Sequence, residues 1–105
     1  GSGAGKGFHR NIPLPAGTND RGYLDALDQA IAQINKFAPT ALVLAAGMDI
    51  LECDPLGAFK VSMGGVEKIG ERIAGLNLPT LICMEGGYNH AALGEGILKL
   101  LKSFI

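Results

Sequence analysis

The stretch Ala41-Leu42-Val43-Leu44-Ala45-Ala46, followed by Gly47-Met48-Asp49, decides the fold of this 105-residue chain. An apolar run without polar alternation predicts a β-strand that is covered on both faces, as in a parallel sheet. Thr80-Leu81-Ile82-Cys83-Met84 predicts a second buried strand of the same kind. Each strand leads into a short polar loop, which begins with Gly47 after the first strand and with Glu85 after the second.

Three amphipathic helices are predicted around these strands, because apolar residues recur at the three- and four-residue spacing of one helix face. The first helix stops at Pro39, and we expect Thr18 or Asp20 to cap its start. The second helix is predicted near residues 63–76, and the third follows Gly86-Gly87. The three apolar stripes are Leu24, Leu27, Ile31, Ile34 and Phe37; Val66, Ile69, Ile73 and Leu76; and Leu93, Ile97, Leu100, Leu101 and Phe104.

The order of the elements predicts an α/β fold with a parallel sheet and right-handed crossovers. Residues 11–15 form a short extended piece whose two prolines confine it to an edge strand or a connector. Counting that piece, the fold has about three strands and three helices. We expect one domain over residues 1–105, with the glycine-rich residues 1–10 flexible.

Composition and charge narrow the range of partners and compartments. The formal net charge is −1 and no basic patch is present, which argues against nucleic acid and anionic membrane surfaces as partners. No apolar run is long enough to span a bilayer. The two cysteines form no CxxC motif and suit reduced thiols in the cytoplasm. We expect Cys83 to lie in the core and Cys53 to be accessible.

Asp49 and Tyr88 are the candidate site residues, because ligands of parallel sheets bind beyond the carboxyl ends of the strands. An ionised aspartate there can ligate a metal ion through oxygen, whereas a capping or turn-stabilising aspartate is the alternative. The Tyr88 phenol follows two glycines and can donate a hydrogen bond to a developing oxyanion. Its alternative is a ring packed on the edge of the sheet.

The segment Asp54-Pro55-Leu56-Gly57 is predicted to form a rigid turn. We expect Asp54 to accept backbone N–H bonds and fix this loop. Leu56 with Pro55 suits either an apolar pocket wall or the core. Gly86-Gly87 gives weak evidence of a phosphate site, and His9 and His90 are expected to be surface residues. The chain has no nucleophile elbow and no Ser-His-Asp set.

Taken together, these segments resemble the C-terminal part of the zinc-dependent histone deacetylase family, which includes the bacterial acetylpolyamine amidohydrolases. The ordered set and its spacing carry the resemblance over nearly the whole chain. The similar segments are Gly3-Ala4-Gly5-Lys6-Gly7, Asn11-Ile12-Pro13-Leu14-Pro15 with Gly17 and Asp20, Phe37-Ala38-Pro39, Leu42 to Asp49, Asp54-Pro55-Leu56-Gly57, and Pro79 to Tyr88.

The resemblance implies a three-layer, Rossmann-like α/β fold of the arginase/deacetylase type and a role for each matching residue. Asp49 would be a zinc ligand, and Tyr88 would hydrogen-bond the substrate carbonyl and the tetrahedral oxyanion. Gly86 and Gly87 would line the acyl pocket, and Pro55 and Leu56 would form part of the tunnel wall. The implied chemistry is the hydrolysis of acetyl-lysine or acetylated amines, with zinc polarising the amide and activating water.

The paired catalytic histidines of the family and its Asp-x-His zinc ligands have no counterpart in this sequence. One carboxylate does not make a three-ligand catalytic zinc site. We therefore expect a C-terminal segment that binds no zinc alone, is inactive alone and pairs with a missing N-terminal portion. The start at Gly1-Ser2 suits a fragment or the remnant of a tag. The alternative is a standalone non-catalytic module that self-associates through its truncated sheet, as a dimer or higher oligomer.

Overall fold

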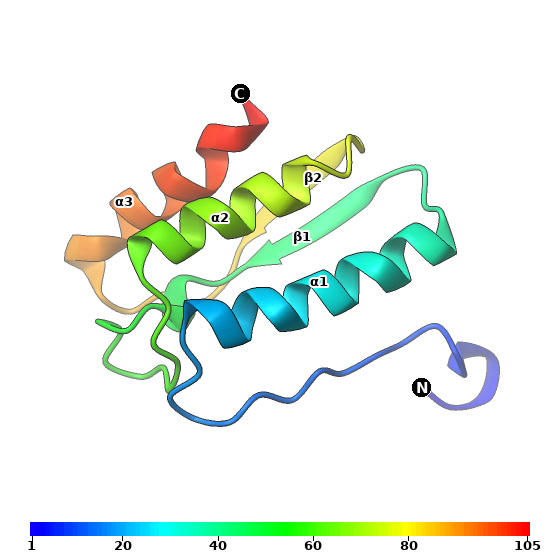
Figure 1. The fold of residues 1–105 in the computed structure, drawn as a ribbon, viewed down its shortest axis with the longest axis horizontal. Helices are drawn as coiled ribbons and strands as arrows, with labels where there is room; N and C mark the ends of the chain where they lie inside the picture. Colours follow the sequence, from blue (N-terminus) through cyan, green and yellow to red (C-terminus); the bar gives the residue numbers. More distant parts are fainter.

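The computed structural model describes residues 1–105 and confirms a small α/β fold (Figure 1). The helices are α1 (Asp20–Phe37), α2 (Met63–Ala74) and α3 (His90–Leu101), and the strands are β1 (Leu42–Ala46) and β2 (Thr80–Met84). Three single 3-10 turns, η1 (Gly3–Gly5), η2 (Met48–Ile50) and η3 (Lys102–Phe104), complete the set. The strands are parallel, and their register runs from Leu42 opposite Thr80 to Ala46 opposite Met84.

The sheet has two strands, so the expectation of about three is wrong. Residues 11–15 form a connector and not an edge strand. This segment runs beside α1 without joining the sheet (Figure 1). Pro13 and Pro15 have no N–H to donate to a neighbouring strand, which is the physical reason. Residues 1–10 are exposed throughout.

Each helix begins at a side chain that caps it. Asn19 accepts a hydrogen bond from the Gly22 N–H and starts α1, which corrects the expectation of Thr18 or Asp20. Asp20 instead accepts hydrogen bonds from the backbone N–H and the hydroxyl of Ser62, and Ser62 in turn caps α2. The starts of α1 and α2 are therefore tied together through one aspartate and one serine.

The core lies between the sheet and the helices and draws on all three predicted stripes. α2 contributes Val66, Ile69 and Ile73, and it packs between α1 and α3. Gly70 allows the close approach of α3, because a Cβ there would lie 2.5 Å from the carbonyl oxygen of Leu100. The nine buried residues of this cluster are Leu24, Ala46, Met48, Leu51, Val61, Val66, Ile69, Ile73 and Leu100.

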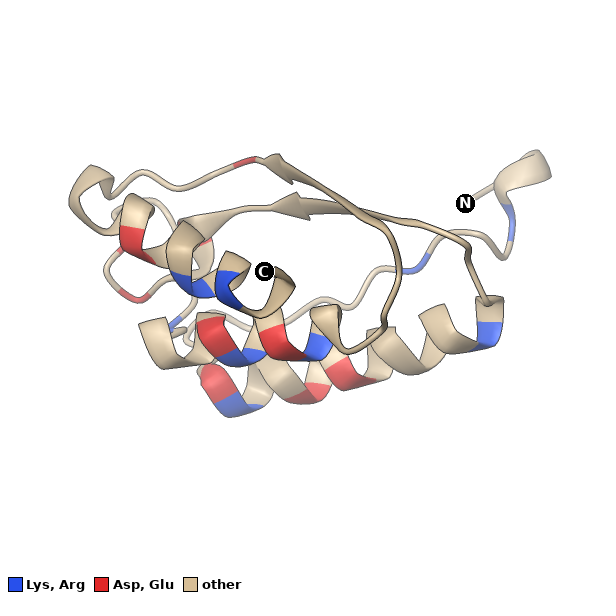
Figure 2. Cartoon of the chain, turned by 90° about the horizontal axis from the view of Figure 1, so that it is seen from above, with Lys and Arg blue, Asp and Glu red and all other residues tan.

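All three helices lie on one side of the sheet, so the chain has one sheet layer and one helix layer (Figure 2). Leu42, Leu44 and Ile82 point toward the helices and pack on the core cluster. The opposite face is bare, with Val43 68% exposed, Leu81 62% exposed, and Ala45 and Cys83 also exposed. We call Val43, Ala45, Leu81 and Cys83 the bare face.

Exposed apolar residues on the bare face and at the end of α1 correct three expectations. The strands are covered on one face only, and Cys83 is exposed because it lies on the other. Phe37, expected on the packed stripe, is exposed and makes an edge-to-face contact with Phe8, with ring centroids 6.4 Å apart. A continuous apolar strand is typical of a sheet that is covered on both faces. The helices of this chain cover only one face.

No helix of the chain is both long enough and apolar enough to cross a bilayer.

Candidate functional site

Hydrogen bonds beyond the strand ends hold the two candidate loops together. The Glu85 N–H donates to the carbonyl of Ala46 over 2.9 Å, and the Met48 N–H donates to the carbonyl of Gly86 over 2.8 Å. These bonds continue the β1–β2 ladder into the loops. They place the Asp49 turn beside Gly86-Gly87, at the carboxyl edge of the sheet where ligands of such folds bind.

Asp49 occupies the middle of the 3-10 turn η2 and is half-buried. Its carboxylate lies against two glycines. A Cβ at Gly47 would come within 2.5 Å of Oδ1, and a Cβ at Gly86 would overlap Oδ2. Residues larger than glycine at either position would push the carboxylate away, so both glycines define where it lies.

No N–H or O–H group of the chain donates a hydrogen bond to the Asp49 carboxylate. A capping or turn-stabilising aspartate would accept such a bond, so the alternative interpretation of Asp49 is not met. Two carboxylate oxygens remain available at the edge of the sheet. Oxygen of this kind is a ligand for zinc and for harder cations.

Asp54 has the opposite environment, although it lies only a few residues further along the chain. It is 7% exposed, and its carboxylate accepts three backbone hydrogen bonds. Oδ1 accepts from the N–H groups of Leu56 (2.8 Å) and Gly57 (2.9 Å), and Oδ2 accepts from the N–H of Tyr88 (2.7 Å). Asp54 therefore fixes its own loop and also holds the loop that follows β2.

The pKa of the Asp54 carboxyl lies below its usual range. Desolvation by burial alone would raise this pKa, but the N–H groups of Tyr88, Leu56, Gly57 and Asn89 together outweigh it. Hydrogen bonds that stabilise the charged form are the cause. Asp54 therefore keeps its charge at a lower pH than an aspartate with an ordinary pKa.

Leu56 and Pro55 are exposed, which removes the core as their location. Gly57 places this loop directly against the Asp49 turn, because a Cβ on Gly57 would overlap the carbonyl oxygen of Asp49. An apolar side chain is therefore presented to solvent next to the Asp49 turn. The assignment of Pro55 and Leu56 to a pocket wall stays a prediction.

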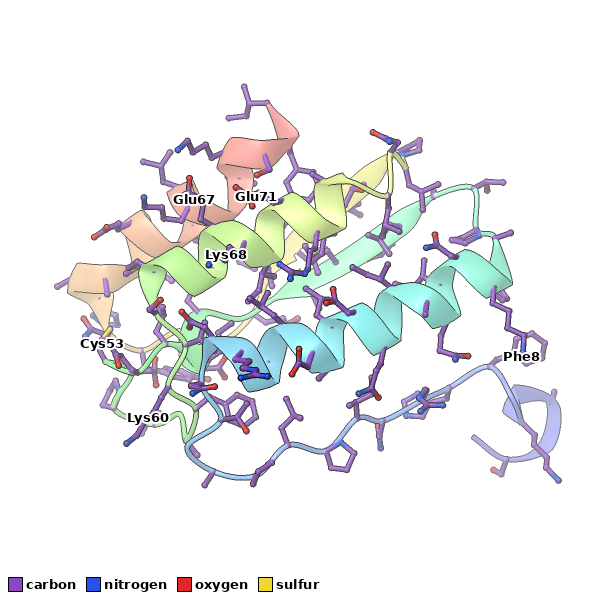
Figure 3. The ribbon with its side chains drawn as sticks, in the orientation of Figure 1. Phe8, Cys53, Lys60, Glu67, Lys68 and Glu71 are labelled. Atoms are coloured by element: carbon purple, nitrogen blue, oxygen red, sulfur yellow. The ribbon has the colours of Figure 1, made fainter.

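Tyr88 is half-exposed and follows Gly87, whose φ of +136° is a conformation that other residues rarely adopt. The next residue, Asn89, caps α3 by accepting the Ala92 N–H, and its side-chain amide donates to the carbonyl of Cys53 over 2.9 Å. Cys53 lies in the loop at this end of the molecule and is exposed, as expected (Figure 3). His90 and His9 are exposed, as expected.

Two residues at this edge were missed in the sequence. Asn89 carries a detectable signal, since an asparagine directly before an apolar-periodic segment is a helix cap. Tyr23 of α1 carries no detectable signal in the sequence, because its neighbours in the fold come from distant segments. The pKa of the Tyr23 phenol is raised, first by burial and second by the negative charge of Asp49, and its ring meets Phe59 edge-to-face at 6.0 Å.

The donor set for a metal ion is incomplete within this chain. No group of three or more histidine, cysteine, aspartate or glutamate side chains lies close enough together to hold one. Asp49 offers one oxygen ligand, whereas a catalytic zinc needs three protein ligands. The residues of this chain alone do not fit the metal that the family resemblance implies.

Comparisons with known proteins find relatives of nearly the whole chain. The histone deacetylase domain matches residues 1–104. Acetylpolyamine amidohydrolase 1 of Pseudomonas aeruginosa is 40% identical over 104 residues, and the acetylpolyamine amidohydrolase of Burkholderia pseudomallei is 38% identical over 104 residues. Each match covers 99% of this chain and 30% of the relative.

The folds agree as well. The crystal structure of acetylpolyamine aminohydrolase from Burkholderia pseudomallei superposes with a TM-score of 0.94 at 35% identity, over 99% of this chain and 30% of that one. The chain thus spans about a third of the length of the relatives that it matches. By sequence and by fold, it belongs to the histone deacetylase domain family.

Proposed function

We propose that this chain supplies the Asp49 and Tyr88 part of a zinc-dependent amidohydrolase site that acts on acetylated amines. The environment of Asp49 is the observation that carries this proposal. Its carboxylate accepts no hydrogen bond from the chain and lies at the same edge as the Tyr88 loop. Both carboxylate oxygens of nearby Asp54, in contrast, accept backbone N–H bonds. An aspartate that is positioned by two glycines yet unpaired suits a ligand.

The proposed reaction is hydrolysis of an amide. Water adds to the acyl carbon, the C–N bond breaks, and the departing amine takes a proton, which gives acetate and a free amine. Zinc, when bound, would polarise the acyl oxygen. Asp49 would be one of its ligands, and the histidine proton donors and remaining ligands would come from residues outside this chain.

Tyr88 and the loops give this chain its own share of the chemistry. The half-exposed Tyr88 phenol would donate a hydrogen bond to the acyl oxygen and stabilise the charge that develops there. Gly86 and Gly87 would line the acyl pocket with backbone alone, because the place of a Cβ is already taken by the Asp49 carboxylate at Gly86 and by Leu93 and Met48 at Gly87. Pro55 and Leu56 would border the aliphatic part of an acetylated amine, the substrate class that the names of its amidohydrolase relatives state.

We propose the remaining part of a deacetylase domain as the partner of the bare face. The matched relatives are more than three times as long as this chain, so further elements of their domains are available to cover that face. Val43 also borders an open hollow of about 660 Å³ lined by Phe8 and Phe37, which extends the apolar surface toward α1. Figure 2 shows that the strands carry no charged residue, whereas charges gather on the helix layer.

A chimera tests the proposed activity. Residues 1–105 would replace the matched segment of the Burkholderia pseudomallei acetylpolyamine amidohydrolase, and chelator-sensitive hydrolysis of an acetylated polyamine would be measured. We expect activity in the chimera and none in the isolated chain. Asp49→Ala should abolish zinc binding, and Tyr88→Phe should lower kcat by about 10²–10³-fold, as for loss of one oxyanion donor.

Asp25→Ala is the matched control, because Asp25 is an exposed aspartate on α1 that should leave both readouts unchanged. Full activity in the Asp49→Ala chimera would refute the proposal. Turnover by the isolated chain would refute the expectation that it is inactive alone.

Thiol labelling tests the proposed partner. Cys83 should react readily with a bulky thiol reagent in the isolated chain and be protected in the chimera, because it lies on the bare face. A cytoplasmic location belongs to the same proposal, since two exposed, unpaired thiols suit a reducing compartment. A discrete dimer of the isolated chain with Cys83 already protected would instead favour self-association through the bare face.

A further inference from the structure

We propose that Asp54 is a positioning residue that couples the Leu56 wall to the Tyr88 phenol. The inference rests on the proposed function, because it assigns Asp54 a part in placing Tyr88 rather than only in forming its own turn. Asp54 is the one side chain that hydrogen-bonds to both loops, and these loops are 34 residues apart in sequence.

The two carboxylate oxygens of Asp54 accept hydrogen bonds from different loops. Oδ1 receives both N–H groups of the local turn, at 2.8 Å and 2.9 Å, and Oδ2 receives the Tyr88 N–H, at 2.7 Å. An asparagine has a single acceptor oxygen. If that oxygen keeps the two local bonds, the NH₂ group faces the Tyr88 N–H, and two donors then oppose each other.

A second bridge runs parallel to the first. The side-chain amide of Asn89 donates a hydrogen bond to the carbonyl of Cys53. This bond lies next to the one between Tyr88 and Asp54 in both loops. Asn89 also caps α3, which links the start of that helix to the same loop. Burial of Asp54 shields its bonds from competing water, whereas the Asn89 bridge is exposed.

Tyr88 lies between two residues that are themselves held, because the Gly86 carbonyl accepts the Met48 N–H and Asn89 caps α3. Within this segment, the Tyr88 N–H makes its own hydrogen bond to Asp54, and the side chain is half-exposed. No hydrogen bond of the Tyr88 hydroxyl to the rest of the chain is present. The Tyr88 N–H bond to Asp54 is thus the fixed point of the backbone that carries the phenol.

Amide hydrogen exchange in the 105-residue chain tests the coupling directly. In the wild type, the Tyr88 amide should exchange slowly although its side chain is half-exposed. In Asp54→Asn, the Tyr88 amide should exchange about 10- to 100-fold faster, as for loss of a hydrogen bond to a charged group, while the Leu56 and Gly57 amides stay protected. Asp28→Asn, which removes an exposed carboxylate on α1, is the control that should leave all three amides unchanged.

A freely exchanging Tyr88 amide in the wild type would refute the inference, and this result does not require any variant to fold. Equal loss of protection at Leu56, Gly57 and Tyr88 in Asp54→Asn would also refute it, because Asp54 would then serve only the stability of the whole region.

Kinetics of the chimera test the catalytic consequence. Asp54→Asn should lower kcat with little change in KM, because the Tyr88 phenol is proposed to act on the developing oxyanion. In a Tyr88→Phe background the same substitution should cost much less, since the group that it positions is already absent. Multiplicative effects of the two substitutions would refute a positioning role. Failure of the proposed function would appear separately, as activity that does not depend on Asp49.

Discussion

Val43 and Leu44 are neighbours on β1, yet they lie in opposite environments. Leu44 packs on the core formed with α2, and Val43 is 68% exposed on the bare face. Leu81 and Ile82 repeat the contrast on β2, because paired residues of parallel strands point to the same side. One face of the sheet is thus part of a hydrophobic core, and the other carries the same kind of side chain without cover.

The contrast teaches that an apolar pattern in a strand does not by itself tell whether one face or both faces are covered within the chain. Val, Leu and Cys on the bare face are as apolar as the residues that meet the helices. A strand with one solvated face usually alternates with polar residues, and these strands do not. The bare face is therefore as apolar as the covered face, although no element of this chain packs on it.

A pair of leucine truncations should show the largest difference between the two faces. Leu100 is 2% exposed in the core, whereas Leu81 is 62% exposed on the bare face. We expect Leu100→Ala to lower the free energy of unfolding by about 2–5 kcal/mol. Leu81→Ala should change it by less than about 0.5 kcal/mol, as for an exposed site. Urea unfolding of the isolated chain measures both.

Similar losses in the two variants would break the comparison. They would mean that the bare face is covered in solution, and a concentration-dependent unfolding midpoint would then identify self-association as the cover.

Glycines of α2 should show a smaller difference, which tests how tightly the covered side is packed. A Cβ at Gly70 would press on the Leu100 carbonyl, while a Cβ at Gly64 would meet only the Ser62 hydroxyl, at 3.7 Å. We expect Gly70→Ala to destabilise the chain by about 1–3 kcal/mol through overpacking. Gly64→Ala should stabilise it by up to about 1 kcal/mol, because alanine is the better helix former. Equal effects, read from thermal unfolding, would show that α2 and α3 are not in close contact.

An ion-pair cluster on the helix layer should give the smallest effect, and it is confined to acid pH. Lys102 and Lys99 hydrogen-bond to Glu67 and, together with their charges, lower its pKa from 4.5 to about 2 despite partial desolvation (Figure 3). A pKa that is depressed in the folded state contributes stability above the unfolded value. That contribution is lost as the pH falls from 4.5 toward 2.

Glu67→Gln should therefore flatten the pH dependence of unfolding in that window, with Glu95→Gln as an exposed control that keeps the wild-type slope. An unchanged slope in Glu67→Gln would show that the cluster on α2 and α3 does not contribute to acid stability.

The covered face and the candidate site differ in how far the sequence predicts them. Helical periodicity identifies Leu24, Val66, Ile69 and Leu100 as core, because these contacts form within and between adjacent elements. The cap of α1 was misassigned, since Thr18, Asn19 and Asp20 are all good capping residues. Only the contact of Asp20 with Ser62, 42 residues away, decides between them.

The sequence by itself determined the element types, the α/β class and the family, because periodicity and ordered motifs are local properties of the chain. Tertiary structure alone decided that the helices cover one face of the sheet and that Cys83 is exposed. It also decided that Tyr23 lies near enough to Asp49 for the negative charge of Asp49 to contribute to the raised pKa of Tyr23. It also decided that Asp54, which the sequence predicts to fix its own loop, holds the Tyr88 loop as well. Asp54 meets N–H groups from its own turn and from a loop 34 residues away, whereas Asp49 meets two glycines and no donor. Which donors reach a carboxylate depends on how distant segments pack, and residue type does not specify that.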